Sequence, residues 1–183
     1  MKLHLFGASG TGVSTLGEAL AQVLPVPYFN TDDYFWETSD PPFTRRRPPA
    51  VRAARLAHDL ARQESWIVGG SIVGWDEKWL AAFDLVVFLW LPPALRLQRL
   101  RLREHARYGH LLLTDPGQAA RTQAFLDWAA GYDDSSTGGT RTLATHTRWL
   151  AQFACPVLEL RGDLPVAERL AAVRARLHQL GPA

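Results

Sequence analysis

The feature that most constrains the fold is a short apolar segment that runs into a glycine-rich turn and then into a helix. Residues 3–6 read L-H-L-F and end at Gly7, which begins the stretch G-A-S-G-T-G-V-S-T. From Ser14 apolar side chains recur at spacings of three and four residues until Pro25 stops the pattern. We therefore predict a buried strand, a tight loop and an amphipathic helix, the first unit of a layered α/β structure.

The same alternation continues along the chain. Further strands are predicted at residues 26–30, 66–70, 83–91 and 155–160, and helices at about 50–63, 93–108, 118–130, 143–153 and after residue 165. The T-D-D after the second strand is expected to form a turn, and the proline- and arginine-rich residues 37–49 a loop. This order predicts a mostly parallel sheet with helices on both faces. The 183 residues fit one domain, 1–183, with a mobile segment at about 108–142.

Composition argues against several classes of protein. Apolar residues make up 47% and charged residues 21% of the chain, a balance typical of a globular protein. The formal net charge is only +2 and no stacking-platform motif accompanies it, so nucleic-acid binding is not expected. No apolar run is long enough for a signal peptide or a membrane span, and Cys155 is the only cysteine, so we expect a cytoplasmic protein without membrane association. The six histidines show no pair at metal-ligand spacing, and His146 is expected at the surface.

The glycine-rich stretch matches a phosphate-binding pattern except at one position. Gly7, Gly12 and Ser14 fit G-x-x-x-x-G-K-[ST], but Val13 stands where the pattern has lysine. Glycines permit the backbone conformations in which successive N–H groups converge, and a helix N-terminus adds about half a positive charge. Main-chain groups can therefore hold a phosphate without the lysine, and the Ser14 hydroxyl is placed to reach Mg²⁺. The alternative is that the turn is only a tight connection between a strand and a helix.

The absence of the lysine is expected to lower the rate of a reaction at a bound phosphate more than it affects the fold. A charge about 4 Å from a phosphate contributes around 4 kcal/mol at an effective dielectric of 20. Removing one donor aimed at developing charge slows chemistry by about 10²- to 10³-fold. Other cations can substitute in part: Arg96, Arg99, Arg103 and Arg107 are spaced by three, four and four residues and form one helical stripe, which also fits a solvated face. We predict that Val13→Lys leaves folding intact and preserves or raises nucleotide affinity.

A dinucleotide-binding loop is the competing interpretation. G-A-S-G also opens such loops in some reductases, and Asp32 lies about twenty residues further on, where a ribose-binding acid would stand. Against it, the spacing G-x-G-x-x-G fails, since Gly10 and Gly12 are followed by Thr15. A short-chain reductase would also need a tyrosine four residues before a lysine, and the residue four before Lys78 is glycine. An NAD(P)-binding protein is therefore the minor alternative.

Four stretches carry a resemblance to a known group: G-A-S-G-T-G-V-S-T, N-T-D-D-Y, W-I-V-G-G-S and the arginine-rich helix after F-L-W-L-P-P. In these the chain resembles the small P-loop kinases, the adenylate-kinase-like and shikimate-kinase-like group, with a Walker A loop that lacks its lysine. The resemblance implies a three-layer α/β fold, a five-stranded parallel sheet in order 2-3-1-4-5, and a lid. It also implies ATP- and Mg²⁺-dependent phosphoryl transfer to a small-molecule acceptor, most nearly a nucleotide or nucleoside. A monomer or homodimer is expected.

The resemblance also implies roles for particular residues. Nucleotide binding would fall to Gly7, Ser9, Gly10, Thr11, Gly12, Val13, Ser14, Thr15 and Arg99, with residues 162–165 bordering the adenine. Catalysis would fall to Asp32, Arg103, Arg107 and Arg141, and Mg²⁺ binding to Ser14 and Asp32. The acceptor would meet Asp33, Tyr34, Trp36, Arg46, Gly70 and Ser71. The alternative in another class is a nucleotide-binding switch with weak or no transfer activity, which the missing lysine leaves open.

Overall fold

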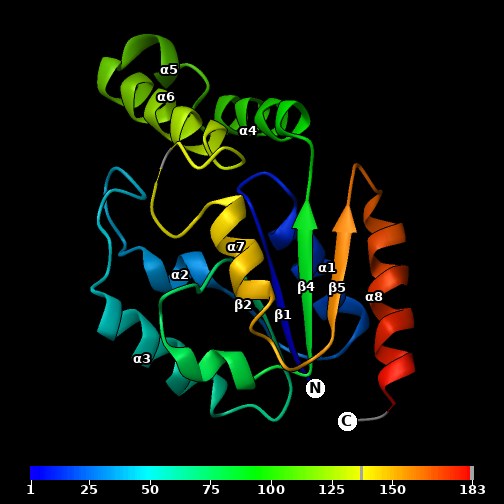
Figure 1. Ribbon diagram of the computed structural model, residues 1–183. Helices are drawn as coiled ribbons and strands as arrows, with labels where there is room; N and C mark the ends of the chain where they lie inside the picture. The colour runs from blue at the N-terminus through cyan, green and yellow to red at the C-terminus, as the bar shows by residue number, and fades with distance from the viewer. Residues whose placement is uncertain (137, 182–183) are drawn as a thin grey trace.

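The computed structural model describes residues 1–136 and 138–181, in which five strands form one parallel sheet in the order β2-β3-β1-β4-β5 (Figure 1). The strands are β1 (Lys2–Gly7), β2 (Tyr28–Asn30), β3 (Trp66–Gly69), β4 (Leu85–Trp90) and β5 (Val157–Arg161). The predicted fold class and strand order are therefore confirmed. The order differs from the 3-2-1-4-5-6 order of dinucleotide-binding sheets, which counts against the NAD(P) alternative.

Helices cover both faces of this sheet. They are α1 (Val13–Val23), α2 (Thr31–Phe35), α3 (Pro49–Leu60), α4 (Pro93–Tyr108), α5 (Leu111–Thr114), α6 (Pro116–Ala130), α7 (Leu143–Leu150) and α8 (Val166–Leu180), with a 3₁₀ turn η1 (Glu77–Ala81). Side chains of β1 alternate between two apolar clusters: Leu5 packs with residues of α1 and α8, and Phe6 with residues of α3 and α7. The period of two along each strand thus places one helical layer on each face.

One local expectation was wrong, and the structure adds detail to another segment. The T-D-D sequence is not a turn but the first part of α2, and the side chain of Asn30 caps this helix by accepting a hydrogen bond from the N–H of Asp32 at 3.1 Å. Residues 108–142 include the helices α5 and α6, which lie beside α4 above the sheet in Figure 1. Residue 137, within the stretch expected to be mobile, lies outside the described residues. None of the described helices combines the length and apolarity that a membrane crossing needs.

The carboxyl ends of the strands determine where a ligand can bind. β1 leads into the glycine-rich loop, β2 into α2, and β4 into α4. Because all five strands are parallel, these connections meet at one edge of the sheet, and β1 at its centre is the point where the chain order reverses. Ligands of open α/β sheets bind in the crevice at such a position.

Candidate nucleotide and acceptor site

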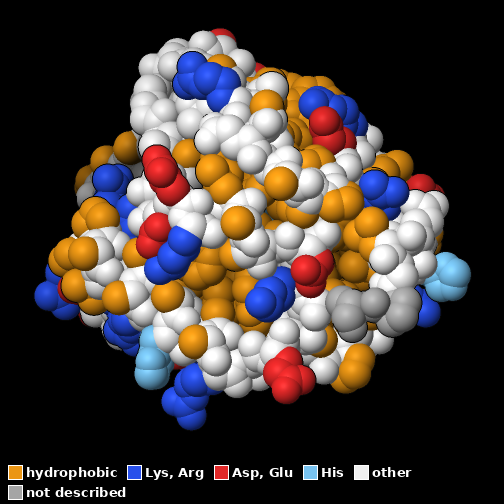
Figure 2. All heavy atoms as spheres, turned by 60° about the horizontal axis from the view of Figure 1, so that its bottom comes forward, with side chains coloured by type: hydrophobic (Ala, Val, Ile, Leu, Met, Phe, Trp, Pro, Cys, Tyr) orange, Lys and Arg blue, Asp and Glu red, His pale blue; other side chains and the backbone are white. Residues whose placement is uncertain are grey.

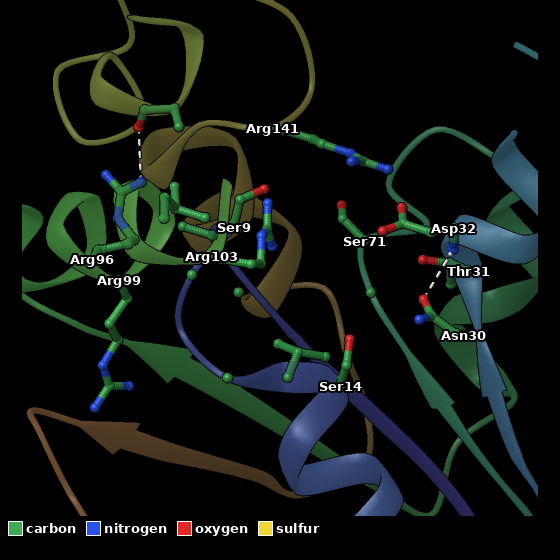
Figure 3. A pocket seen from close by; sticks show the side chains of 18 of the residues that line it. Ser9, Ser14, Asn30, Thr31, Asp32, Ser71, Arg96, Arg99, Arg103 and Arg141 are labelled. Atoms are coloured by element: carbon green, nitrogen blue, oxygen red, sulfur yellow. Dashed lines mark hydrogen bonds between the residues drawn. The ribbon is translucent and has the colours of Figure 1, made fainter. Parts of the chain in front are cut away.

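A cavity of about 540 Å³ lies at this carboxyl edge. Its walls come from the glycine-rich loop, the start of α2, the residues after β3, α4, and the chain between α6 and α7. The predicted site residues that line it are Gly7, Ser9, Gly10, Gly12, Val13, Ser14, Thr15, Asp32, Asp33, Gly70, Ser71, Arg99, Arg103, Arg107 and Arg141. In Figure 3 the loop side of the cavity, with Ser9 and Ser14, lies opposite Ser71 and Asp32.

The loop has the backbone geometry of an anion-binding nest. Gly10 and Gly12 have φ values of +87° and +91°, in the left-handed region that glycine adopts without strain. The loop is closed by Thr11, whose N–H and hydroxyl both donate to the carbonyl of Ala8, at 3.2 and 2.8 Å. Gly12 stands at the N-cap of α1, and no side chain caps this helix end. The N–H groups of the first turn are therefore left for a ligand at the cavity wall.

The side chains of Thr11 and Val13 are more buried than those of Ser14 and Thr15. Thr11 is fully buried and does not line the cavity, because its hydroxyl is used inside the loop. Val13 lines the cavity but is half-buried and packs against the apolar cluster beneath α1 and α8. The Ser14 and Thr15 side chains are exposed at the start of the helix. The isopropyl group thus contributes to the core as well as to the cavity wall.

The acidic residues of α2 face a cation. Asp32 and Asp33 lie in the first turn of α2 and are exposed, and burial together with the Asp32 charge raises the pKa of Asp33. Arg141 extends toward Asp32 in Figure 3 and, among the described residues, forms no ion pair with a carboxylate. Burial lowers the pKa of Arg141, and the Asp32 charge acts in the opposite direction. A cation and a carboxylate therefore share this side of the cavity.

The arginines of the α4 stripe differ in how deeply they are buried and in which carboxylate they pair with. Arg96 is 1% exposed, donates to the carbonyl of Ala129 at 2.8 Å and forms an ion pair with Asp133 at 2.7 Å, so it holds the end of α6. It is thus neither solvated nor free to turn to a ligand. Arg99 is paired with Asp163.

Farther along α4, the buried carboxylate of Glu104 forms ion pairs with two arginines. Arg103 lies 2.9 Å from it and Arg107 lies 3.7 Å from it. Two guanidinium groups share one carboxylate, so an excess of positive charge remains at the cavity.

Three predicted acceptor residues do not line the cavity. The Tyr34 hydroxyl donates to Asp59 of α3 at 2.8 Å, so this ring is buried against α3. Trp36 and Arg46 form an antiparallel bridge to each other, which fixes the loop after α2. Phe43, from the same loop, lines the cavity instead. Since loop residues lack a regular period, no sequence pattern distinguishes Phe43 from its neighbours.

Near α2, Arg52 lies with two of the predicted arginines, Arg46 and Arg141, and only Arg52 was not predicted from the sequence. The guanidinium carbons of Arg52, Arg141 and Arg46 lie 4.6, 4.9 and 5.9 Å from the centre of the Phe35 ring. Burial lowers the pKa of Arg52, and the charges of Arg141 and Arg46 act in the same direction. The Arg52 Nε is buried without a hydrogen-bond partner among the described residues. The aromatic ring thus gathers three cations whose mutual repulsion an anion would relieve.

His146 is buried, not at the surface as expected. It is fully enclosed, and burial, with a smaller contribution from Arg141, lowers its pKa to about 3. Its two ring nitrogens lie 3.1 Å from the Ser71 hydroxyl and 2.9 Å from the Tyr132 hydroxyl. Ser71 and Tyr132 both line the cavity, so a neutral histidine connects the end of β3 to the chain after α6. This link depends on contacts between residues 14 and 75 positions apart, which no local pattern predicts.

A second cavity, of about 320 Å³, lies between the loop, α4 and the start of α8. Its lining includes Gly12, Thr15, Arg99, Arg169 and residues 163–166. Most of the segment expected to border an adenine therefore does border a cavity, and this cavity shares Gly12, Thr15 and Arg99 with the first.

The residues present fit a nucleotide and Mg²⁺. The uncapped helix end and the left-handed glycines suit a polyphosphate, and a second cavity adjoins the loop for the rest of a nucleotide. Ser14 and Asp32 offer oxygen ligands on facing walls, and no cluster of three or more His, Cys, Asp or Glu side chains occurs in the described part of the chain. Mg²⁺ needs no such cluster, since it is held by one or two protein oxygens together with phosphates and water.

Comparison with known proteins agrees with this geometry. No family model matches the chain. It is 42% identical over 168 residues to the uncharacterized protein YqaC of Bacillus subtilis (strain 168), covering 92% of each chain. It is also 29% identical over 117 residues, 58% of this chain and 67% of the other, to shikimate kinase of Bacteroides thetaiotaomicron.

Two solved structures have the same fold. The crystal structure of the Bacteroides shikimate kinase matches with a TM-score of 0.56 and 18% identity, over 97% of this chain and 98% of that one. The structure of deoxyadenosine kinase from M. mycoides with bound dATP matches with a TM-score of 0.56 and 13% identity, over 97% and 99% of the two chains. Together with the loop, these matches show that the chain has the fold of the small P-loop kinases. Within that class it belongs to the family of B. subtilis YqaC.

Proposed function

We propose that the protein is an ATP-dependent, Mg²⁺-requiring kinase that phosphorylates a small-molecule acceptor. The observation that carries the proposal is the nest at Gly10–Gly12, whose uncapped helix end opens into the same cavity as Asp32. An anion site facing a carboxylate across a cavity is the arrangement that in-line phosphoryl transfer requires. The names of the structural neighbours support the same class of reaction.

Each group in the cavity has a role in this proposal. Loop amides hold the phosphates of ATP, and Ser14 and Asp32 would hold Mg²⁺, which would neutralise charge on them. Asp32 orients the acceptor hydroxyl and accepts its proton. Arg103, Arg107 and Arg141 stabilise the charge of the group in transfer, which is spread over several oxygens.

The acceptor in this proposal carries an anionic group of its own. The three arginines around Phe35 support this, since no carboxylate among the described residues forms an ion pair with Arg46, Arg52 or Arg141. Guanidinium groups recognise phosphate and carboxylate, and Phe43 adds an aromatic surface to the cavity wall. A nucleoside monophosphate, with an anion and a flat base, satisfies both features.

The test combines binding and turnover. Calorimetry with ATP and Mg²⁺ should show binding, and ADP release should depend on an acceptor when AMP, dAMP, shikimate and gluconate are supplied. Adenosine is the matched control for AMP, because it lacks only the anion. Absence of ATP binding would overturn the kinase proposal, and turnover with adenosine but not AMP would overturn the anionic acceptor.

A nucleotide-binding switch is the second candidate, and the apolar Val13 favours it. With valine in place of the lysine, the loop can bind a nucleotide yet stabilise the moving phosphoryl group poorly. ATP binding without acceptor-dependent ADP release across the panel is the result expected of a switch.

A further inference from the structure

A buried arginine braces the glycine-rich loop on the side of the second cavity. Arg169 belongs to α8, far from the loop in sequence, yet its Nη1 donates to the main-chain carbonyl of Thr11 at 2.7 Å. The side chain is 4% exposed, and its Nε has no hydrogen-bond partner among the described residues. A guanidinium group keeps its proton even when buried, so a full positive charge is held against the loop.

The loop is built to let this cation approach. A side chain at Gly12 would place its Cβ 2.9 Å from the Arg169 Nη1 and would displace the guanidinium group from this position, and the φ of +91° also favours glycine. In a trans peptide the C=O and the N–H point in opposite directions. Since the Thr11 carbonyl points at Arg169, the N–H of Gly12 in the same peptide points to the other side of the loop. A charged donor on the carbonyl polarises that peptide and strengthens its N–H as a donor.

The neighbouring charges neutralise little of the positive charge of Arg169. Burial lowers the pKa of Arg169, Arg99 acts in the same direction, and Asp163 acts in the opposite one. Asp163 is itself paired with Arg99, so two arginines face one carboxylate at the second cavity. A polyphosphate on the loop would supply the missing negative charge.

We propose that Arg169 takes over, from behind the loop, the electrostatic part of the role that a lysine at position 13 would have in nucleotide binding. It is a positioning residue: it acts on the phosphates through the Thr11–Gly12 peptide and through its charge. The inference rests on the proposed function, because it requires that the loop binds a nucleoside triphosphate.

The test separates charge from structure by calorimetry with ATP and Mg²⁺. Arg169→Gln, which keeps a donor but removes the charge, should weaken affinity by about 10- to 100-fold. Arg169→Lys should stay within about threefold of the wild type, because charge is retained. Arg174→Met, on an exposed position of the same helix, is the control and should change nothing. Equal losses in the Gln and Lys variants would mean that Arg169 only packs the loop, and unchanged affinity in Arg169→Gln would overturn the proposal outright.

Placing a lysine at position 13 provides the second test. Val13→Lys added to Arg169→Gln should restore most of the lost affinity, whereas in the wild type it should raise affinity by about threefold or less, because the two cations are redundant. A larger gain in the wild type would show that the two cations are not redundant, which would contradict the proposal. This measurement tests the proposal even if Arg169→Gln fails to fold. Failure of the wild type to bind ATP is a different result, which overturns the proposed function itself.

Discussion

Asp32 shows how one residue acquires a role from its neighbours. Its main-chain N–H is held by the side chain of Asn30, which fixes the first turn of α2 at the cavity, and its carboxylate remains exposed there. The Arg141 side chain extends toward it in Figure 3. Asp33 follows on the same helix, but burial and the Asp32 charge raise its pKa, which makes its charged form less favourable. Because Arg141 extends toward Asp32, this carboxylate is the better candidate for the acceptor hydroxyl.

Replacing Asp32 by asparagine tests this assignment. Asp32→Asn should slow acceptor-dependent ADP release by about 10²- to 10⁴-fold, because the group that accepts the proton is lost while the shape is kept. ATP affinity measured by calorimetry should change little. Asp33→Asn is the matched control and should retain most of the activity. If Asp33→Asn lost the activity and Asp32→Asn retained it, Asp33 would be the residue that accepts the proton of the acceptor hydroxyl.

The contact between β3 and α2 is the element-scale feature on which the acceptor side depends. Gly70, just after β3, has a φ of +109°, and a Cβ there would lie 1.9 Å from the Thr31 Oγ1. Thr31 is fully buried at the start of α2, so it has no room to withdraw. The strand end and the helix carrying Asp32 can therefore approach this closely only with glycine at position 70.

Gly70→Ala should accordingly lower the free energy of unfolding by about 1–3 kcal/mol through backbone strain, with a further loss from the clash. Gly139→Ala is the matched control: its φ is also positive, at +76°, but nothing lies within 4 Å of the added Cβ. Urea denaturation of both variants isolates the steric part. Equal destabilisation of the two would show that the Thr31 contact does not limit this position.

At the scale of the whole molecule, two histidines make stability depend on pH. His4 in β1 and His146 in α7 are both fully buried under the same face of the sheet, where His4 packs edge-to-face on Trp149 (5.3 Å). Burial lowers the pKa of each to about 3, against 6.5 for an exposed histidine. The folded protein therefore binds fewer protons than the unfolded chain at pH values between these two limits.

The free energy of unfolding should consequently be highest above pH 6.5 and should fall as the pH decreases toward 3. The limiting slope is about 1.4 kcal/mol per pH unit for each histidine. Thermal unfolding between pH 7.5 and 5 measures it, and His146→Gln, which can still hydrogen-bond but does not titrate, should reduce the slope. An unchanged slope in this variant would mean that His146 does not contribute.

The face of the molecule shown in Figure 2 carries no concentrated patch of charge. On the face shown in Figure 2, basic and acidic side chains are interspersed among apolar ones and no single charge type gathers over one element. This agrees with the low net charge of +2 and adds no support for nucleic-acid binding.

The sequence by itself determined the alternation of strands and helices, the parallel sheet and the glycine-rich loop at the end of β1. These follow from local patterns: short apolar runs, periods of two and of three to four, and glycines at the turn. Even the strand order was available, through the resemblance carried by a few such stretches.

Only the tertiary structure decided which distant residues meet at that loop and around the cavity. Arg169 reaches Thr11 from α8, His146 joins Ser71 to Tyr132, and Arg96, in the cavity wall, holds the end of α6. An arginine in a helix reads the same in sequence whether it is solvated, paired or placed behind a phosphate loop. What distinguishes these cases is burial and the partner within hydrogen-bond reach, and both arise only when separate segments of the chain pack together.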